Sequence, residues 1–156
     1  ASTIASGSTD TTVRVWNRDG TSKGDPFKGH TGWVWAVAFS PTQKNLLVSC
    51  GDDNSVKLWD SDQPGTAPLF SLKGAHTDEV RAAAFSRSGD LLVTGSDDTT
   101  VLISKVHDNS LAPASVLKGH EDPVRCVSFS PDASTVASGA DDFTIRLWDV
   151  EKGIEL

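Results

Sequence analysis

The amino-acid sequence predicts an all-β fold made of a repeated unit, and three observations lead to this prediction. One phrase of similar sequence occurs four times, over residues 3–17, 46–60, 91–105 and 135–149. A Gly-His phrase precedes three of the copies, at residues 29–30, 74–76 (where Ala75 interrupts it) and 119–120. Short runs in each copy alternate apolar with small or polar residues, which is typical of half-buried strands.

The runs define four short strands in each repeat. The first strand is expected over residues 34–39, 80–85 and 124–129, and the second over residues 46–50, 91–95 and 135–139. The third is expected over residues 55–59, 100–104 and 144–148, and the fourth over residues 69–72 and 115–117. Gly- and Asp-rich turns separate the second strand from the third, since Asp closes tight turns with its own side chain. Residues 60–68 and 107–113 vary most and are expected to be exposed loops.

The period supports a more specific prediction. The anchor position of the phrase holds Trp16, Trp59, Ser104 and Trp148, so successive copies start 43–45 residues apart. A period of roughly 40–45 residues, with Gly-His early and Trp-Asp late, is typical of one blade of a β-propeller. The chain resembles the WD-repeat β-propeller family over nearly its whole length. The resemblance implies four-stranded antiparallel blades packed radially around a channel.

On this basis residues 1–156 form a single partial propeller. Blade one covers residues 1–28 and lacks the first strand, blade two covers 29–73, and blade three covers 74–118. Blade four covers 119–156 and has an incomplete fourth strand. The chain contains no methionine, which indicates a processed or partial sequence. We therefore expect a fragment of a larger ring, seven-bladed by family analogy, and self-association through its open blade faces.

Composition excludes several functional classes. The net charge of −7 lacks the basic footprint of nucleic-acid binding. No apolar run approaches the ~18 residues of a membrane span, and no signal peptide is present, so membrane insertion is not expected. The two cysteines, Cys50 and Cys126, lie in different repeats and do not form a disulfide framework. A reducing, cytoplasmic location is the expectation.

Each full repeat holds His, Ser or Thr, and Asp at a fixed spacing, which in one copy alone would suggest a nucleophile system. Repetition argues against catalysis, because one fold rarely carries several equivalent active sites. In the WD-repeat family these residues form a buried structural network with the Trp. We expect complete networks in the second and fourth copies and none in the third, where Ser104 replaces Trp. The residues are His30, Ser49, Asp53 and Trp59; His76, Thr94 and Asp98; and His120, Ser138, Asp142 and Trp148.

Partner binding is predicted at positions that repeat in place but vary in type. Those that flank the first valine of the first strand face the top of the channel in the family, and Trp and Arg often anchor interfaces. The acidic residue before each turn Asp lies near the same face. The predicted partner-binding residues are Trp33, Trp35, Glu79, Arg81, Arg125, Asp52, Asp97 and Asp141. These residues suit a partner segment that has an acidic or aromatic anchor flanked by a basic residue. The alternative is that one of the two tryptophans packs between blades and does not bind a partner.

The predicted function is a non-enzymatic scaffold for a protein or peptide partner, without metal or other cofactor. The adjacent aspartates lack the loop spacing of known calcium motifs. A carbohydrate-binding propeller is the first alternative, with exposed tryptophans stacking on sugars. The phrase over residues 30–41 also resembles repeats in the sensor arrays of signal-transduction NTPases, so a ligand-sensing module is the second alternative.

Overall fold

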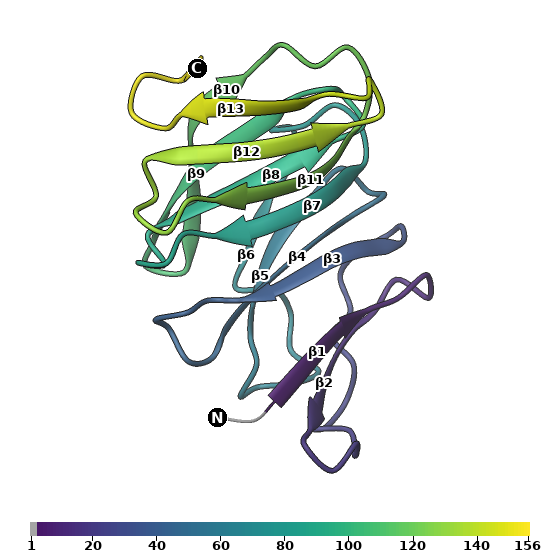
Figure 1. The fold of residues 1–156 in the computed structure, drawn as a ribbon. Helices are drawn as coiled ribbons and strands as arrows, with labels where there is room; N and C mark the ends of the chain where they lie inside the picture. Colours follow the sequence, from purple (N-terminus) through teal and green to yellow (C-terminus); the bar gives the residue numbers. More distant parts are fainter. Residues whose placement is uncertain (1–2) are drawn as a thin grey trace.

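The computed structural model, which describes residues 3–156, consists of one two-stranded and three four-stranded antiparallel sheets (Figure 1). The first sheet contains β1 (Thr3–Gly7) and β2 (Val13–Asn17). The second contains β3 (Val34–Phe39), β4 (Leu46–Gly51), β5 (Val56–Asp60) and β6 (Phe70–Leu72). The third contains β7 (Val80–Phe85), β8 (Leu91–Ser96), β9 (Val101–His107) and β10 (Ser110–Leu117). The fourth contains β11 (Val124–Phe129), β12 (Thr135–Ala140), β13 (Ile145–Asp149) and β14 (Ile154–Glu155).

In every sheet the strands lie side by side in chain order, so each sheet is a simple meander made from one repeat. The register is the same in all four copies. The anchor position of each repeat pairs with the same position of the preceding strand: Ile4 with Trp16, Leu47 with Trp59, Leu92 with Ser104, and Val136 with Trp148. The repeat seen in the sequence is therefore a repeat of structure. Among residues 3–156 no helix is long and apolar enough to cross a membrane.

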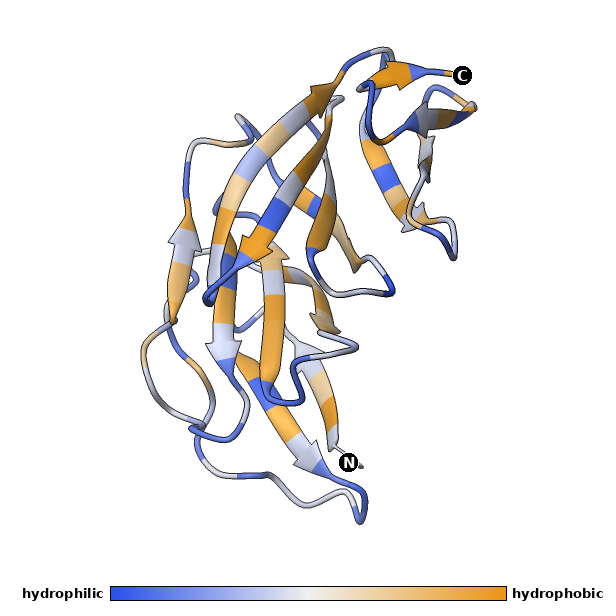
Figure 2. Ribbon diagram, turned by 90° about the vertical axis from the view of Figure 1, so that its left-hand side faces the viewer, coloured by the Kyte–Doolittle hydropathy of each residue, from blue (hydrophilic) through white to orange (hydrophobic). Residues whose placement is uncertain are grey.

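The core consists of three apolar layers, each between two successive sheets. Val13, Val15 and Phe27 pack against Leu47 and Trp59 of the second sheet. The opposite face of the second sheet packs on the third, and the third packs in turn on the fourth. Inner strands thus bury both faces, and every residue of β4 is buried. Figure 2 shows the resulting hydrophobic bands along the strands between the sheets.

Two local expectations were wrong. Residues 107–113 are not a loop but a hairpin, in which β9 and β10 are joined at Asp108 and Asn109. Both of these residues adopt positive φ (46° and 59°), a conformation that Asp and Asn tolerate and that matches the twist of paired strands. Pro113 is accommodated because β10 is an edge strand, with a register shift directly after the proline.

The fourth strand of the first repeat is likewise not a full strand. Its segment is joined to β2 only by isolated bridges, between Val13 and Phe27 and between Trp16 and Ser22. Gly20 lies in the turn after β2 and Gly24 lies between Ser22 and Phe27; both take positive φ, and Gly24 bends the backbone away from a continuous ladder. The first strands of repeats two to four, β3, β7 and β11, match their expected ranges at both ends, and the other strand boundaries differ by at most three residues.

The outermost sheets each leave one face open. Ile145 and Leu147 of β13 are 80% and 48% exposed, and Ile4 of β1 is 60% exposed. The corresponding positions of inner sheets, such as Val56 and Leu58, are buried against a neighbouring sheet. The open faces therefore carry side chains of the type that other sheets use for packing.

We expect the chain to self-associate through these open faces, because burying their apolar surface stabilises a complex. Replacing Ile145 and Leu147 together with Lys should weaken association by about tenfold or more. Sedimentation velocity over a concentration series measures this. Leu69 and Val116, which are exposed on outer segments, provide the matched double Lys control. A parent chain that stays monomeric at every concentration would contradict the expectation.

Candidate functional site

One aspartate closes the turn between the second and third strands of each repeat. Its carboxylate accepts hydrogen bonds from the amide and hydroxyl of the residue two positions later, at 2.6–3.2 Å. The residue between them takes positive φ, between 58° and 72°. These local bonds hold a strained turn in one conformation. The aspartates are Asp10, Asp53, Asp98 and Asp142.

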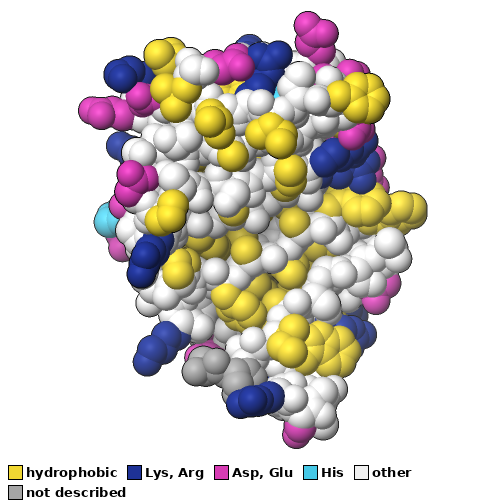
Figure 3. Space-filling view, viewed as in Figure 1, with side chains coloured by type: hydrophobic (Ala, Val, Ile, Leu, Met, Phe, Trp, Pro, Cys, Tyr) yellow, Lys and Arg dark blue, Asp and Glu magenta, His cyan; other side chains and the backbone are white. Residues whose placement is uncertain are grey.

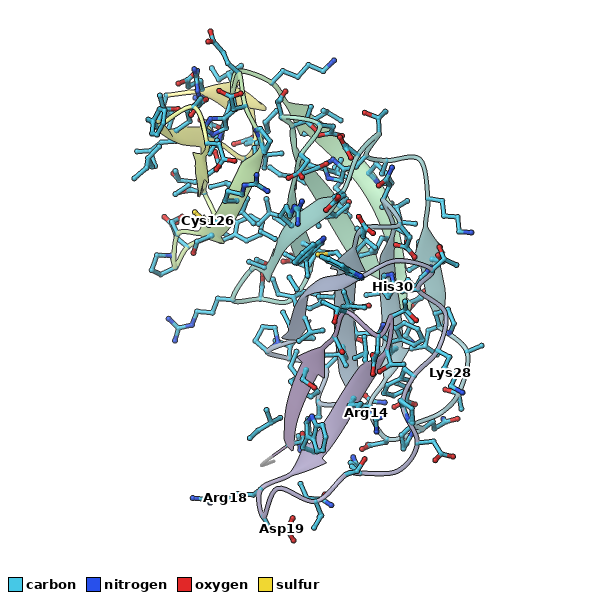
Figure 4. The ribbon with its side chains drawn as sticks, turned by 90° about the vertical axis from the view of Figure 1, so that its right-hand side faces the viewer. Arg14, Arg18, Asp19, Lys28, His30 and Cys126 are labelled. Atoms are coloured by element: carbon cyan, nitrogen blue, oxygen red, sulfur yellow. The ribbon has the colours of Figure 1, made fainter. Side chains whose placement is uncertain are left out.

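In the second repeat, Asp53 continues into a buried network. Its carboxylate lies 2.9 Å from His30 Nδ1 and accepts a 3.0 Å bond from the Thr31 amide. His30 Nε2 lies 2.7 Å from Ser49 Oγ, which accepts a 2.7 Å bond from Trp59 Nε1. One assignment satisfies every group: the indole donates to Ser49, Ser49 donates to His30, and His30 donates to Asp53. Figure 4 shows His30 among the side chains between the sheets, whereas Arg18 and Asp19 project from the tip of the first sheet.

The fourth repeat contains the same network. His120 lies 2.7 Å from Asp142 and 2.7 Å from Ser138, whose Oγ accepts a 2.8 Å bond from Trp148. The first repeat retains only one link of this chain, the 2.9 Å bond from Trp16 Nε1 to Ser6 Oγ.

The third repeat departs from the expectation that it forms no network. His76 lies 3.0 Å from Asp98 and 2.8 Å from Thr94, so only the indole is missing. The aspartate turn and the histidine are sufficient to form the remaining bonds without it.

The interrupted Gly-His phrase of the third repeat also has a physical reason. A Cβ built on Gly29 or Gly119 would lie 3.1 Å from the indole of Trp59 or Trp148. The third repeat has Ser104 instead of Trp, so this indole is absent and Ala75 can stand before the histidine. Ala75 and Ser104 are therefore compatible as a pair.

The network geometry resembles a catalytic triad, but its position rules out nucleophilic attack. Ser49 is fully buried, Ser138 is 2% exposed, and both hydroxyls already accept an indole N–H. A nucleophile must reach its substrate, and these hydroxyls do not. Among residues 3–156, no group of three or more His, Cys, Asp or Glu side chains is arranged to hold a metal ion.

Burial and hydrogen bonding act in opposite directions on the carboxylates of the network. Burial raises the pKa of Asp98, but bonds from Thr100 and the Thr77 amide outweigh it, and the net pKa lies below its ordinary value. The pKa of Asp53 is lowered in the same way by His30 and Ser55. Burial lowers the pKa of His76 despite the neighbouring Asp98. The folded chain therefore favours ionised aspartates and a neutral His76.

The predicted partner-binding residues lie where the first strands of repeats two to four begin. Each of these strands has a register irregularity after its first valine, so Trp35, Arg81 and Arg125 have no partner in the regular ladder. Such a bulge reverses the alternation of side chains and directs the extra residue outward. It explains how Val34 and Val37, which lie three residues apart, both pack in the same apolar layer while Trp35 between them is exposed.

The structure brings these residues together in one row that crosses three sheets. Trp33 and Trp35 form an edge-to-face pair with ring centroids 5.4 Å apart. The Trp35 indole donates to Glu79 at 2.9 Å, and the Arg81 guanidinium lies 4.2 Å from the centre of a Trp35 ring. Arg81 also pairs with Glu79, at 2.5 Å. We call this row the rim; it contains Trp33, Trp35, Asp52, Glu79, Arg81, Asp97, Arg125 and Asp141.

The rim continues as alternating charges. Arg81 binds Asp97 through two nitrogens, at 2.7 Å and 3.0 Å. Arg125 bridges to Asp97 at 2.9 Å and to Asp141 at 2.5 Å. Partial burial and the neighbouring Asp52 carboxyl raise the pKa of Glu79, against the effect of Arg81. Both arginines are therefore already paired with carboxylates of this chain, which the sequence did not indicate.

At the opposite ends of the same strands lies an open groove of about 410 Å³, lined by residues that include Ala38, Ala84, Phe85 and Phe129. Figure 3 shows hydrophobic side chains across the middle of the face on which β3, β7 and β11 lie. The groove has no charged residue except Arg87 in its lining. The sequence prediction missed this groove because its residues read as ordinary strand positions.

Comparison with known proteins agrees with the repeat structure. A family model described as WD domain, G-beta repeat, matches residues 1–17, 21–60, 67–103 and 111–149. The chain is 37% identical over 102 residues to a ribosome biogenesis protein WDR12 homolog of Nematostella vectensis, which covers 64% of this chain and 24% of that protein. It is 35% identical over 108 residues to the protein transport protein SEC13 of Chaetomium thermophilum, which covers 64% of this chain and 35% of that protein. It is also 33% identical over 100 residues to apoptotic protease-activating factor 1 of Danio rerio, covering 60% and 8%. The chain thus spans about a third or less of these relatives.

Trp59→Phe should lower the free energy of unfolding by about 1–3 kcal/mol, because it leaves the buried Ser49 hydroxyl without its donor. Urea unfolding of parent and variant measures the difference. Trp16→Phe is the matched control. Trp16 donates to Ser6, which makes no further bond to a histidine, so this variant should lower the free energy of unfolding by less. Equal unfolding midpoints for parent and Trp59→Phe would contradict the network's contribution.

The free energy of unfolding should fall as the pH is lowered. Because the pKa of His76 is lower in the folded chain, the unfolded chain binds more protons below about pH 6.5. The lowered pKa values of Asp53 and Asp98 add to this loss below about pH 4. Denaturant titrations at pH 8, 6 and 5 test the first window, with the exposed-histidine variant His107→Gln as a control that keeps the slope. Constant stability between pH 8 and 5 would be the contrary result.

Proposed function

Because this chain belongs to the WD-repeat family, we propose that it is a non-enzymatic scaffold that binds a segment of another protein at the rim. One observation carries the proposal: the exposed Trp33–Trp35 pair stands on a surface that is otherwise fixed by ion pairs, one within the third sheet and one between the third and fourth sheets. Exposed tryptophan on a rigid surface is the usual anchor of a protein interface, since its ordering costs little conformational entropy.

Rigidity of the rim supports binding rather than catalysis. Arg81 is held by Asp97, Glu79 and the Trp35 ring at once. Such a side chain has already lost its rotamer freedom before a partner arrives. The hydroxyls that could act as nucleophiles are buried in the sheets, away from this surface.

The relatives support a shared scaffold and not a shared process. Their names refer to ribosome biogenesis, protein transport and apoptotic protease activation. These proteins share the repeat with this chain, so the choice of partner is determined by the residues that vary between blades. The two free cysteines support the cytoplasmic location that we include in the proposal.

Carbohydrate binding is the weaker candidate. Sugar stacking requires an open ring face, but one face of Trp35 lies under Arg81 and its neighbour Trp33 approaches it edge to face. A role as a ligand-sensing module of a larger protein remains compatible with the match to apoptotic protease-activating factor 1. In that setting the rim would still be the binding surface.

Trp33→Ala and Trp35→Ala should each weaken binding of a protein partner by about 2 kcal/mol or more, with little change in melting temperature. A phage-displayed peptide library selected against the chain supplies the ligand, and calorimetry measures its affinity. Leu69→Ala is the matched control, because Leu69 is exposed to a similar degree on a different segment. If both tryptophan variants fold and bind unchanged, the rim is not the site; if they unfold, these residues belong to the core.

A further inference from the structure

The rim has a repeating pattern of bulge residue and acid. In the third repeat, the bulge residue Arg81 pairs with Asp97, the acid that precedes the turn aspartate. In the fourth repeat, the bulge residue Arg125 pairs in the same way with Asp141. The two pairs occupy equivalent places in their sheets and follow the same register irregularity.

The second repeat breaks this pattern. Its bulge residue is Trp35, and its equivalent acid is Asp52. The Asp52 backbone is fixed as in the other repeats, since its amide donates to the Trp33 carbonyl at 2.8 Å. Asp97 and Asp141 make the same bond, to the carbonyls of Glu79 and Pro123 at 2.9 Å. Asp52 is exposed and makes no ion pair with any of the residues 3–156.

The rim has more negative than positive charge, and the excess negative charge lies at the end that contains Asp52. Four carboxylates face two guanidiniums, and Asp97 is neutralised from both sides by Arg81 and Arg125. Glu79 lies beside Asp52 and shares Arg81 with Asp97. Two neighbouring carboxyls therefore meet at the edge of an exposed aromatic pair. Aromatic faces and carboxylates together attract a cation and repel an anion.

We propose that the rim takes a cationic side chain of the partner, preferentially an arginine, at the place between Asp52 and the Trp33–Trp35 pair. The partner's guanidinium there supplies the charge that Arg81 and Arg125 supply in the next two repeats. This inference rests on the proposed scaffold function and specifies its ligand. The sequence analysis expected a partner with an acidic anchor, whereas this inference assigns a basic one. The reason is that both rim arginines already form ion pairs with carboxylates of this chain.

The contact already present within the chain supports the choice of ligand. Arg81 sits over the Trp35 ring while it binds two carboxylates, Glu79 and Asp97. This is the arrangement proposed for the partner's arginine, with Trp33 and Asp52 as the corresponding groups. Guanidinium suits the place better than ammonium because it is planar, stacks on indole and pairs with a carboxylate through two nitrogens.

The test uses three blocked tripeptides, acetyl-Ala-Arg-Ala-amide and its Gln and Glu counterparts, as probes. Their binding is followed by the indole N–H resonances of Trp33 and Trp35 in nitrogen-15 correlation spectra, assigned with Trp33→Phe and Trp35→Phe. The arginine peptide should shift both resonances, and the Gln and Glu peptides should not. Asp52→Asn should lower the affinity for the arginine peptide by about tenfold. Asp108→Asn removes the same charge from the distant hairpin and should leave the affinity for the arginine peptide unchanged.

Trp35→Arg provides a second, independent variant. It restores the arginine of the other repeats next to Asp52, so it should keep the fold and abolish the shift of the Trp33 resonance by the arginine peptide. Equal or stronger binding of the Glu peptide, or full binding by Asp52→Asn, would overturn the cation assignment and leave the scaffold proposal standing. Failure of every library peptide to bind at the rim would instead overturn the scaffold proposal itself.

Discussion

The carboxylate that closes each turn between the second and third strands is the contact on which the other features depend. Asp53 holds its own strained turn through Ser55, and it holds the preceding segment through His30 and the Thr31 amide. Since the aspartate joins segments more than twenty residues apart, it fixes where β3, the first strand of its own repeat, begins. Trp33 lies two residues beyond Thr31, and Asp52 lies directly before Asp53. A buried structural network therefore sets the position of the exposed rim.

The same dependence explains how the third repeat tolerates a sequence change that looks severe. Loss of the indole at Ser104 removes one donor at the far end of the chain of bonds, but the bonds that Asp98 accepts from His76 and from the Thr77 amide remain. The backbone entering β7 is held by those bonds and not by the indole. Glu79 and Arg81 consequently occupy the same places in their sheet as Trp33 and Trp35 do in theirs.

Much of the fold could be predicted from the sequence because each repeat has the same pattern of apolar strand residues and turn residues, so the pattern can be recognised in several copies. The 43–45-residue spacing of the anchor positions, which include Trp59 and Trp148, predicted sheets that the structure shows in equal register. The two-residue hairpin at Asp108 could not be predicted, because it depends on two left-handed residues without the glycine that usually marks such a turn. For the candidate site, the sequence indicated which residues to consider but not how their side chains are arranged. The outward direction of Trp35 comes from a bulge, and bulges leave no periodic signal in a sequence.

The central claim is that buried aspartates hold an exposed rim rigid, and amide hydrogen exchange measures this directly. The amides of Thr31, Asp52, Thr77 and Asp97 lie in turns and connections, yet each donates to a network aspartate or a rim carbonyl. The account predicts that they exchange about as slowly as strand amides, and far more slowly than the amide of Asn109 in the exposed hairpin turn. Exchange of these four amides at the rate of an ordinary exposed turn would contradict it.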